Sequence, residues 1–298
     1  MFLSNYHSHC NFCDGRSSME EFVHFAIAKG LKRYGFSSHA PLPFDTFWNM
    51  RADDLPEYKS EFRRLKEKYA GQIELFLGLE MDYIHEVFEV QDAFYPVDDL
   101  DYLIGSVHYL DRLPDGSFMS IDGSFSKFNH GLQTGYDGDV WALVDRFFEA
   151  SRAMVSKGGF QLVGHMDKIA LNASKCPEFS IRDPRYLTLV GDLLTLIKEQ
   201  KMIVEINTKS LVDKGFTYPD VQFFPLLKEL GIPVTVNSDC HYPTNLLDGF
   251  TPAYKALKAA GITTVHQLID GAWQPVEWEG RRGDNLNLYK RQILPLRH

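Results

Sequence analysis

Short apolar runs bounded by turn-forming residues recur along the whole chain and predict seven β-strands. Most of these runs are followed by a stretch in which apolar residues recur at helical spacing. A strand followed by a helix, repeated in this way, predicts a parallel sheet with helices packed outside it. The seven predicted strands are residues 2–6, 33–36, 73–77, 102–104, 160–163, 202–206 and 233–236.

The predicted helices are marked by capping residues at their starts and by glycines near their ends. Ser18 stands three residues before Glu21, which is the spacing of a capping box, and Gly30 lies near the end of the same helix. Pro184 is typical of the first turn of a helix. Further helices are predicted at residues 55–69, 139–157, 184–200, 221–230 and 247–260.

Two segments do not follow this alternation. Residues 109–138 are rich in Gly, Ser and Asp, and connections of this length are often functional, so we predict a lid or a substrate-contacting loop. The residues after about position 273 are predicted to form a packed tail that includes Trp278, Arg281 and Arg282. Because no linker interrupts the elements, residues 1–298 are predicted to form a single α/β barrel domain.

Composition narrows the class of protein. With 44% hydrophobic and 24% charged residues, the chain has the composition of an ordinary globular protein. A net charge of -9 gives no global attraction for nucleic acid or anionic lipid, and we find no local basic patch, so neither partner is expected. No apolar run approaches the roughly 18 residues of a membrane span, and the N-terminus lacks the pattern of a signal peptide. These features predict a cytoplasmic protein.

The candidate chemistry begins at His7 and His9. In an extended strand, alternate side chains leave the same face, about 6.5–7 Å apart along the backbone. Two imidazoles at that spacing can bind one metal ion, although a single His-x-His pair also occurs among ordinary surface histidines. The placement of the other histidines and acids decides between these interpretations.

Six of the seven predicted strands end in residues that can bind a metal, and the remaining strand ends at Asn207. Parallel strands of a barrel point the same way, so their carboxyl ends converge on one face. The converging residues are His7, His9, His39, Glu80, His108, His165, Asp239 and His241. Other histidines do not follow strand ends and are interpreted as structural or solvent-facing; they are His24, His85, His266 and His298.

Eight ligands are too many for one ion, and imidazole with carboxylate suits Zn, Fe or Mn better than Ca or Mg. The pattern therefore predicts two or three clustered divalent transition metals, with Glu80 as the candidate bridging carboxylate. Asp14 has two interpretations. It is either a ninth ligand or a turn former, because it directly precedes Gly15.

The cysteines are predicted to be reduced and to stay away from the metals. The four are too few and too scattered for a disulfide scaffold. Cys10-x-x-Cys13 lacks the second cysteine pair of a zinc site. Cys10 and Cys240 directly adjoin His9 and Asp239, so in an extended chain their side chains should leave the opposite face.

The motifs that contain these residues resemble those of the polymerase and histidinol phosphatase (PHP) superfamily, in the same order and over nearly the whole chain. They are His7-Ser8-His9, Ser37-Ser38-His39, Gly78-Leu79-Glu80, Gly105-Ser106-Val107-His108, Gly164-His165-Met166-Asp167 and Ser238-Asp239-Cys240-His241. The branch that makes L-histidinol for histidine biosynthesis, the histidinol-phosphate phosphatases, is the most similar, through residues 38–41, 105–110 and 205–208. The resemblance implies a distorted seven-stranded, TIM-like (β/α) barrel with a three-metal site at the carboxyl ends of its strands.

The resemblance also implies roles for individual residues. It assigns His7, His9, Glu80 and Asp239 to a first metal, Glu80, His108 and His165 to a second, and Asp14, His39 and His241 to a third. Members of this branch usually carry arginines near the motifs at 164–167 and 205–208, where they help to hold phosphate. Here the nearby cations are lysines, and the candidates for binding phosphate are Lys168, Lys209, Lys214, Arg16 and Arg51.

We therefore expect a histidinol-phosphatase that acts on a small phosphate monoester. Metal ions would activate water and neutralise the phosphoryl charge, so no protein nucleophile is required. The candidate catalytic residues are Glu80, Asp239 and His241, and either Asp239 or His241 would assist the leaving group. Three acidic loop residues are candidates for contact with the cationic part of histidinol, namely Asp111, Asp115 and Asp122.

Other functions remain open at this point. One is a broader PHP phosphoesterase acting on nucleotides, nucleic-acid ends or other small phosphate monoesters, and another is a catalytically silent metal-binding scaffold. A metal-dependent amide or ester hydrolase is disfavoured, because such sites commonly share a lysine between metals. Lys168 comes closest to that place, three residues past His165. The sequence does not indicate an oligomeric state.

Overall fold

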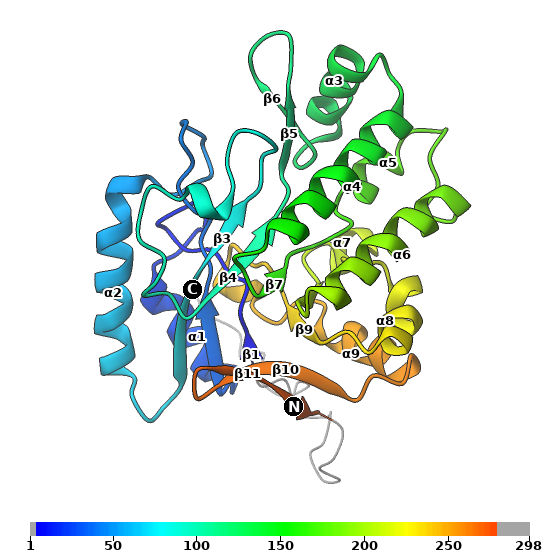
Figure 1. Ribbon diagram of the computed structural model, residues 1–298. Helices are drawn as coiled ribbons and strands as arrows, with labels where there is room; N and C mark the ends of the chain where they lie inside the picture. The colour runs from blue at the N-terminus through cyan, green and yellow to red at the C-terminus, as the bar shows by residue number, and fades with distance from the viewer. Residues whose placement is uncertain (1–3, 279–298) are drawn as a thin grey trace, which may run out of the picture.

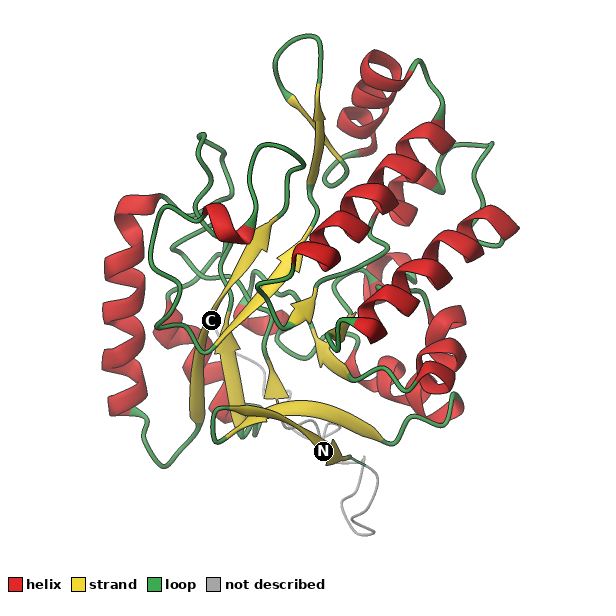
Figure 2. Ribbon diagram, viewed as in Figure 1, coloured by secondary structure: helices red, strands yellow, loops and turns green. Residues whose placement is uncertain are grey.

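Seven parallel strands form the centre of the molecule, and their order in the sheet follows their order in the chain. The structure is a computed structural model that describes residues 4–278. Within them, all seven predicted strands are confirmed (Figure 2). They are β1 (Ser4–Asn5), β2 (Arg33–Phe36), β3 (Glu74–Asp82), β4 (Tyr102–Ser106), β7 (Leu162–Val163), β8 (Ile203–Asn207) and β9 (Val234–Asn237).

The sheet curls until β9 returns to β1 and nearly closes a barrel. Just beyond these two strands, Ser8 and Cys240 form a parallel bridge, and the His9 N–H donates to the Cys240 carbonyl oxygen at 2.9 Å. The Tyr6 N–H donates to Oδ1 of Asn237 at 2.8 Å. The backbones thus meet at few points along this seam, and side-chain hydrogen bonds such as that from Nδ2 of Asn5 to Oγ of Ser238, at 2.7 Å, add to it. The predicted distorted seven-stranded TIM-like barrel is confirmed.

Helices cover the outside of the barrel, as Figure 1 shows. Those that match predicted helices are α1 (Met19–Ala28), α2 (Leu55–Lys68), α4 (Val140–Lys157), α6 (Pro184–Glu199), α8 (Phe224–Leu230) and α9 (Phe250–Ala259). Two short helices were not predicted, α5 (Ile169–Ala173) and α7 (Leu211–Lys214). Among the described residues, no helix has both the length and the apolar character needed to cross a membrane.

The helix ends show the local chemistry that the sequence predicts. Oγ of Ser18 accepts from the backbone N–H of Glu21 at 3.3 Å and caps α1. The last helix, α9, begins three residues later than predicted, after Gly249, whose φ of 74° does not continue a helix. A Cβ on Gly249 would lie 2.8 Å from Cβ of Thr208, so this turn requires glycine.

A hairpin near the end of the described chain closes the amino-terminal end of the barrel. It is made of β10 (Thr264–Ile269) and β11 (Ala272–Glu277), which lie beneath the strands in Figure 1. The Leu268 N–H donates to Oη of Tyr6 at 2.9 Å, and the Trp273 ring lies 4.9 Å from the Tyr6 ring. Leu268 completes an interior cluster with Tyr6, Phe76, Tyr102, Ile104, Leu162 and Ile203.

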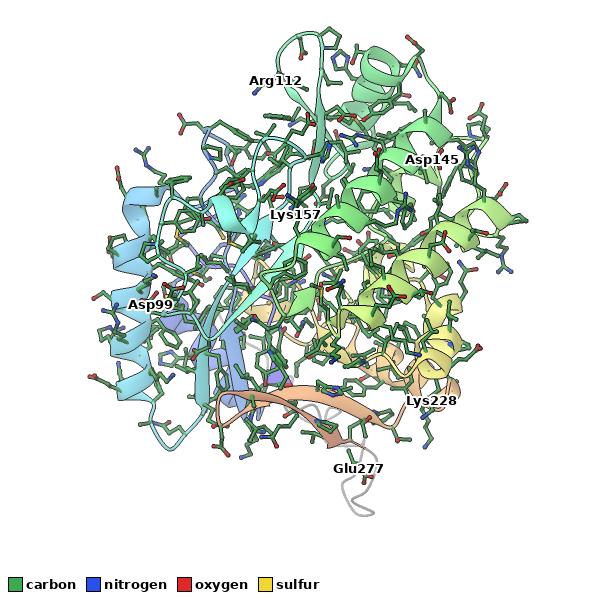
Figure 3. The ribbon with its side chains drawn as sticks, in the orientation of Figure 1. Asp99, Arg112, Asp145, Lys157, Lys228 and Glu277 are labelled. Atoms are coloured by element: carbon green, nitrogen blue, oxygen red, sulfur yellow. The ribbon has the colours of Figure 1, made fainter. Side chains whose placement is uncertain are left out.

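The two irregular segments contain strands and a helix that the sequence pattern did not predict. Residues 109–138 contain a hairpin of β5 (Tyr109–Arg112) and β6 (Phe118–Ser120), followed by α3 (Phe125–Tyr136). The two strands are too short to produce a clear alternation of apolar and polar residues, which is why the pattern concealed them. The hairpin extends away from the barrel, with Arg112 near its outer end (Figures 1 and 3). Its role as a lid stays a prediction.

The tail prediction falls partly on described residues. The Trp278 ring packs edge-on against Tyr254 of α9, with the ring centroids 4.8 Å apart. The hairpin before it, β10–β11, was not predicted. Arg281 and Arg282 lie outside the described residues.

Candidate metal centre

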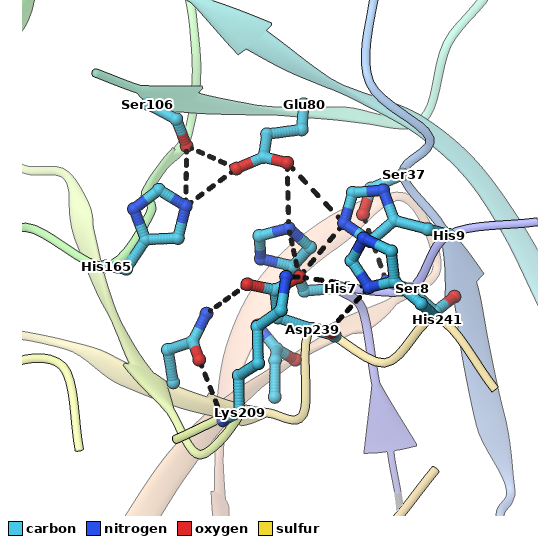
Figure 4. A network of polar contacts seen from close by, with 12 residues as sticks. His7, Ser8, His9, Ser37, Glu80, Ser106, His165, Lys209, Asp239 and His241 are labelled. Carbon is cyan, nitrogen blue, oxygen red and sulfur yellow. Dashed lines mark hydrogen bonds and ion pairs between the residues drawn. The ribbon is translucent and has the colours of Figure 1, made fainter. Parts of the chain in front are cut away.

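The fold brings all nine predicted metal-binding residues to one end of the barrel. His39 and His108 follow β2 and β4, and Asp239 and His241 follow β9. Glu80 differs from the prediction, because β3 continues to Asp82 and Glu80 lies inside the strand and not after it. Figure 4 shows several of these side chains pointing toward one another from different strands.

Glu80 lies at the centre of the cluster, and its two oxygens face different imidazoles. Oε1 is 2.8 Å from Nε2 of His165 and 3.5 Å from Nε2 of His108. Oε2 is 2.9 Å from Nδ1 of His39 and 3.2 Å from Nε2 of His7. A carboxylate with donors on both sides is placed to bridge two cations, as the sequence predicts for this residue.

One side of the cluster is formed by His7, His9 and Asp239, whose ligand atoms all lie within 4.8 Å of one another. Nε2 of His9 is 3.0 Å from Oδ1 of Asp239, and Nε2 of His7 is 3.8 Å from the same oxygen. Asp239 has a φ of 48°, a backbone conformation that is uncommon for residues other than glycine and that often occurs at functional sites.

Asp14 joins His39 and His241 at the mouth of the cluster. Oδ1 of Asp14 is 3.2 Å from Nε2 of His241 and 3.9 Å from Nε2 of His39. A Cβ on Gly15 would lie 2.3 Å from the backbone of His9, so glycine lets this loop pack directly on the ligand strand. The geometry therefore favours the ligand interpretation of Asp14, with Gly15 explained by this close approach.

Two further carboxylates, which the sequence analysis missed, hold the histidines from behind. Oε1 of Glu205 is 2.6 Å from Nδ1 of His7, and Oδ1 of Asp82 is 2.7 Å from Nδ1 of His108. A carboxylate at Nδ1 orients the imidazole and leaves Nε2 for a metal. A charged residue inside an otherwise apolar strand, as in Ile203–Asn207, was the available signal.

Burial and neighbouring charges set the protonation of the cluster. Burial disfavours the charged form of His7, but Glu205, Glu80 and Asp239 outweigh burial and hold the pKa of His7 well above its usual value. Burial and the charges of nearby imidazoles lower the pKa of His9 well below its usual value. Burial and Lys168 lower the pKa of His165 to about 4. Neutral imidazole binds metals, so His9 and His165 are ready to do so at neutral pH.

The donor set fits metal ions. Several of its atoms are shielded from solvent and, although close to one another, form no hydrogen bond of suitable geometry with any described residue: Nε2 of His7, Nδ1 of His39, Oε2 of Glu80 and Oδ1 of Asp14. Buried polar atoms are normally satisfied, so exceptions that face one another indicate an absent partner. Nitrogen and oxygen donors in this mixture suit Zn, Fe or Mn. The assignment of each residue to a particular metal stays a prediction.

The five candidate phosphate-binding cations are placed differently. Nζ of Lys209 is 3.0 Å from Oδ1 of Asp239. Lys168 is only 5% exposed; burial lowers its pKa, but Asp122, Asp239 and Glu80 outweigh burial and raise it, so the side chain stays charged. The Arg16 N–H donates to the His241 carbonyl oxygen at 2.7 Å, while the Arg16 side chain is exposed.

The other two cations lie farther out. Arg51 lines a separate cavity of about 420 Å³, formed by the segment at 42–53 together with Phe94, and none of the nine clustered residues lines that cavity. Lys214 is exposed at the end of α7. The structure thus brings Lys168 and Lys209 to the cluster, places Arg16 at its mouth, and does not bring Arg51 or Lys214 into contact with it.

The acidic loop residues proposed to meet a substrate cation already have partners. Oδ1 of Asp111 is 2.7 Å from the Arg146 guanidinium, and Oδ2 of Asp122 is 2.8 Å from Nζ of Lys168. Oδ1 of Asp115 accepts from the N–H and the hydroxyl of Ser117 in the hairpin turn. These carboxylates are therefore engaged in holding the fold.

The cysteines lie mostly as expected. Cys10 and Cys240 are buried in the hydrophobic core, and burial raises the pKa of the Cys10 thiol to about 11. Cys13 lies closer to the cluster than predicted, with its Sγ 3.6 Å from Nδ1 of His9. That nitrogen faces away from Asp239, so Cys13 contacts the back of the ring. All four cysteines are free.

Comparison with known proteins supplies further evidence. The sequence pattern that defines the PHP domain matches residues 5–209 of this chain. A protein named probable histidinol-phosphatase from Deinococcus radiodurans is 27% identical over 270 residues, covering 88% of this chain and 95% of the relative. The histidinol-phosphatase of Bacillus subtilis is 28% identical over 256 residues, covering 79% of this chain and 92% of the relative.

A solved structure shares the fold. It is the histidinol phosphate phosphatase of Lactococcus lactis in complex with zinc, L-histidinol and phosphate. The TM-score is 0.71 at 19% sequence identity, and the match covers 91% of this chain and 98% of the other. At this identity, the likeness establishes the barrel architecture.

Proposed function

The chain belongs to the PHP domain family, and from that premise we propose that it is a metal-dependent phosphatase that hydrolyses L-histidinol phosphate to L-histidinol and phosphate. The observation that carries this proposal is the convergence of eight other donor residues, histidines and aspartates, around Glu80, with Lys168 and Lys209 beside them. Relatives that match over most of their length bear the name histidinol-phosphatase. The proposal includes a role in histidine biosynthesis, a cytoplasmic location and no nucleic-acid partner.

Divalent transition metals held by this donor set would activate water and neutralise the phosphoryl oxygens. The chain's own residues bind and orient the substrate. We propose that Lys168 and Lys209 attract the phosphate, because Nζ of Lys209 lies 3.0 Å from Asp239 at the cluster and the acids around Lys168 keep its buried ammonium group charged. Glu80 contacts His39 through one carboxylate oxygen and His165 through the other, and so fixes the imidazoles on both of its sides relative to each other. His241, 16% exposed, lies at the mouth with Asp239 behind it and Asp14 beside it. Burial and Lys209 lower the pKa of His241, so its neutral imidazole is placed to hold a metal next to the leaving oxygen.

The test is phosphate release from L-histidinol phosphate by the metal-loaded protein, together with a nucleoside monophosphate and a short oligonucleotide. We expect a clear preference for L-histidinol phosphate and a loss of activity in His9→Ala and Glu80→Ala variants. Equal or better rates on the two nucleic-acid substrates would favour the broader PHP phosphoesterase. Fewer than two transition-metal ions per chain after gentle purification would favour the silent scaffold.

The lysine assignment has its own test. Lys209→Met should raise the KM for L-histidinol phosphate by about tenfold or more, because a charge-assisted contact to phosphate is lost. Lys214→Met is the matched control, since Lys214 is an exposed lysine in the same connection and should leave the KM unchanged. Equal effects of the two variants would count against the assignment.

A further inference from the structure

Two loops bring aromatic rings to the mouth of the metal centre. Trp48 lies in the loop after His39, and Tyr109 directly follows His108. Their rings stack with centroids 5.0 Å apart and planes 20° apart. The Trp48 ring centroid is also 6.5 Å from the rings of both His39 and His108. The indole therefore borders the metal-binding histidines.

The position of Trp48 is tied to the cluster by hydrogen bonds of its neighbours. Nδ2 of Asn49 donates to the Ala40 carbonyl oxygen at 2.7 Å, and the Met50 N–H donates to the His39 carbonyl oxygen at 3.1 Å. The Thr46 hydroxyl donates to Oδ1 of Asn49 at 2.6 Å. Because the loop folds back onto His39, a side chain in it is held in place before a ligand arrives.

We infer that the face of Trp48, supported by Tyr109, binds the end of the substrate that carries the flat imidazole ring and the cationic ammonium group, and so selects it among phosphate monoesters. This inference rests on the proposed function. With the phosphoryl group at the Glu80 cluster, an organic part that extends past His39 and His108 meets the indole. Indole attracts cations more strongly than other aromatic rings and stacks on flat rings such as imidazole.

The pairing of nearby acids strengthens this argument. Asp111 is bound by Arg146 and Asp122 by Lys168, so neither carboxylate is available to a substrate cation without breaking an ion pair. An aromatic face attracts the same cation without adding another negative charge beside an already acidic cluster.

The neighbouring Phe47 provides a matched control. Its ring is 77% exposed and already has Nζ of Lys127 at 4.9 Å from its centroid. The Phe47 ring packs edge-on against Trp48, with the ring centroids 4.9 Å apart. Among the described residues, it makes no ring contact with the histidines of the cluster. Phe47→Leu therefore removes an aromatic ring from the same loop without removing the proposed contact.

The experiment uses the two products as separate probes. Inhibition of L-histidinol phosphate hydrolysis by L-histidinol and by inorganic phosphate is measured for the metal-loaded protein and its Trp48→Leu, Trp48→Phe and Phe47→Leu variants. Trp48→Leu should raise the inhibition constant of L-histidinol by about tenfold and change that of phosphate by less than about twofold. Trp48→Phe should lie between, and Phe47→Leu should resemble the unsubstituted protein.

Two outcomes overturn the inference while leaving the proposed function standing. In one, Trp48→Leu leaves inhibition by L-histidinol unchanged. In the other, both inhibition constants rise together, which would mean that the indole only supports the metal centre. If the unsubstituted, metal-loaded protein releases no phosphate from L-histidinol phosphate, the proposed function itself fails and this inference fails with it.

Discussion

Single carboxylates on the side of the histidines away from the metal centre set the orientation of the imidazole rings. Glu205 is fully buried and receives hydrogen bonds from Nδ2 of Asn207 and Nδ2 of Asn237 in addition to its contact with His7. These bonds fix the carboxylate, and the carboxylate in turn keeps the proton of His7 on Nδ1. The orientation of a ring, as well as its identity, therefore determines whether it can bind a metal.

Glu205→Gln should test this orienting role. Glutamine keeps the size of the side chain but loses the charge that holds His7, so metal affinity or activity should fall by about 10- to 100-fold. The measurement is metal retention during dialysis against graded chelator, alongside kcat. Glu229→Gln, on the exposed face of α8, should change neither quantity. Metal retention equal to that of the unsubstituted protein would contradict the role of Glu205.

Between elements, Glu20 links α1 to α2. Its Oε1 accepts from Nζ of Lys68 at 2.6 Å and from Oη of Tyr69 at 2.8 Å, and its Oε2 accepts from Arg64 at 2.8 Å. The hydrogen bonds from Lys68, Arg64 and Tyr69 lower the pKa of Glu20 to about 2. A carboxylate whose pKa is depressed by folding stabilises the folded state only while it is charged.

This link should make part of the stability depend on pH. The contribution of Glu20 is complete above its unfolded pKa of 4.5 and is lost as the pH falls toward 2. The difference in Tm between the unsubstituted protein and Glu20→Gln should therefore be largest near neutral pH and shrink below about pH 4.5. Thermal unfolding between pH 7 and pH 3 measures it. A difference that stays constant over this range would rule out the link.

Two adjacent strands pack against Tyr102 only because glycines face it. A Cβ on Gly35 of β2 would lie 2.4 Å from Oη of Tyr102, and a Cβ on Gly78 of β3 would lie 2.7 Å from Cζ of the same ring. The Tyr102 hydroxyl donates to the Tyr6 carbonyl oxygen at 2.6 Å, which ties the ring to β1. The barrel interior therefore cannot accept a methyl group at these positions without moving Tyr102.

Gly35→Ala should lower the free energy of unfolding by about 1–3 kcal/mol, because an overpacked core must shift. In a Tyr102→Phe background the same substitution should cost less, since the clashing Oη is gone. Denaturant unfolding of the four proteins in this cycle gives the coupling. Gly191→Ala on α6, where a Cβ meets nothing within 4 Å, should be neutral or stabilising. Equal costs of Gly35→Ala in both backgrounds would contradict the contact.

On the scale of the whole molecule, the donor cluster links strands that backbone bonds join only weakly. The seam between β9 and β1 has few backbone-to-backbone hydrogen bonds and relies on side-chain bonds such as that of Asn5 to Ser238. Asp239 follows β9, and His7 and His9 follow β1. Cations bound there would join both edges of the barrel to Glu80 in β3. Binding of metals should therefore stabilise the folded barrel itself.

Chelation should lower Tm, and added zinc should restore it. A ligand at 100 times its Kd stabilises by about 2.7 kcal/mol, which for a chain of this size corresponds to roughly 4 °C. Differential scanning calorimetry with and without chelator measures the shift. The far-UV circular dichroism spectrum should change little, because the strands and helices do not depend on the ions. Identical Tm values under both conditions would contradict the proposed link.

The alternation of elements along the chain was sufficient to predict seven parallel strands with helices outside them, because each strand carries its own apolar run and its own boundary residues. The closure of these strands into a distorted barrel was expected from the resemblance to the PHP superfamily. The positions of the strand ends also predicted eight of the metal-binding residues. Asp14 could not be assigned in this way, because an Asp before a glycine is either a ligand or a turn former. The β5–β6 hairpin was missed because its strands, of four and three residues, show too little of the two-residue period to be distinguished from loops. The strands of the β10–β11 hairpin have six residues each, but the adjacent polar residues His266 and Gln267 and the proline at position 275 interrupt the pattern of a strand.

By itself, the sequence determined which residues meet, since parallel strands must bring their carboxyl ends to one face. Only the tertiary structure decided how they meet. The contacts of Glu205 with His7, of Asp14 with His241 and of Trp48 with Tyr109 join residues from different loops and strands. Such contacts depend on the curvature of the barrel and on loop conformation, and neither is written in the spacing of residues along one strand.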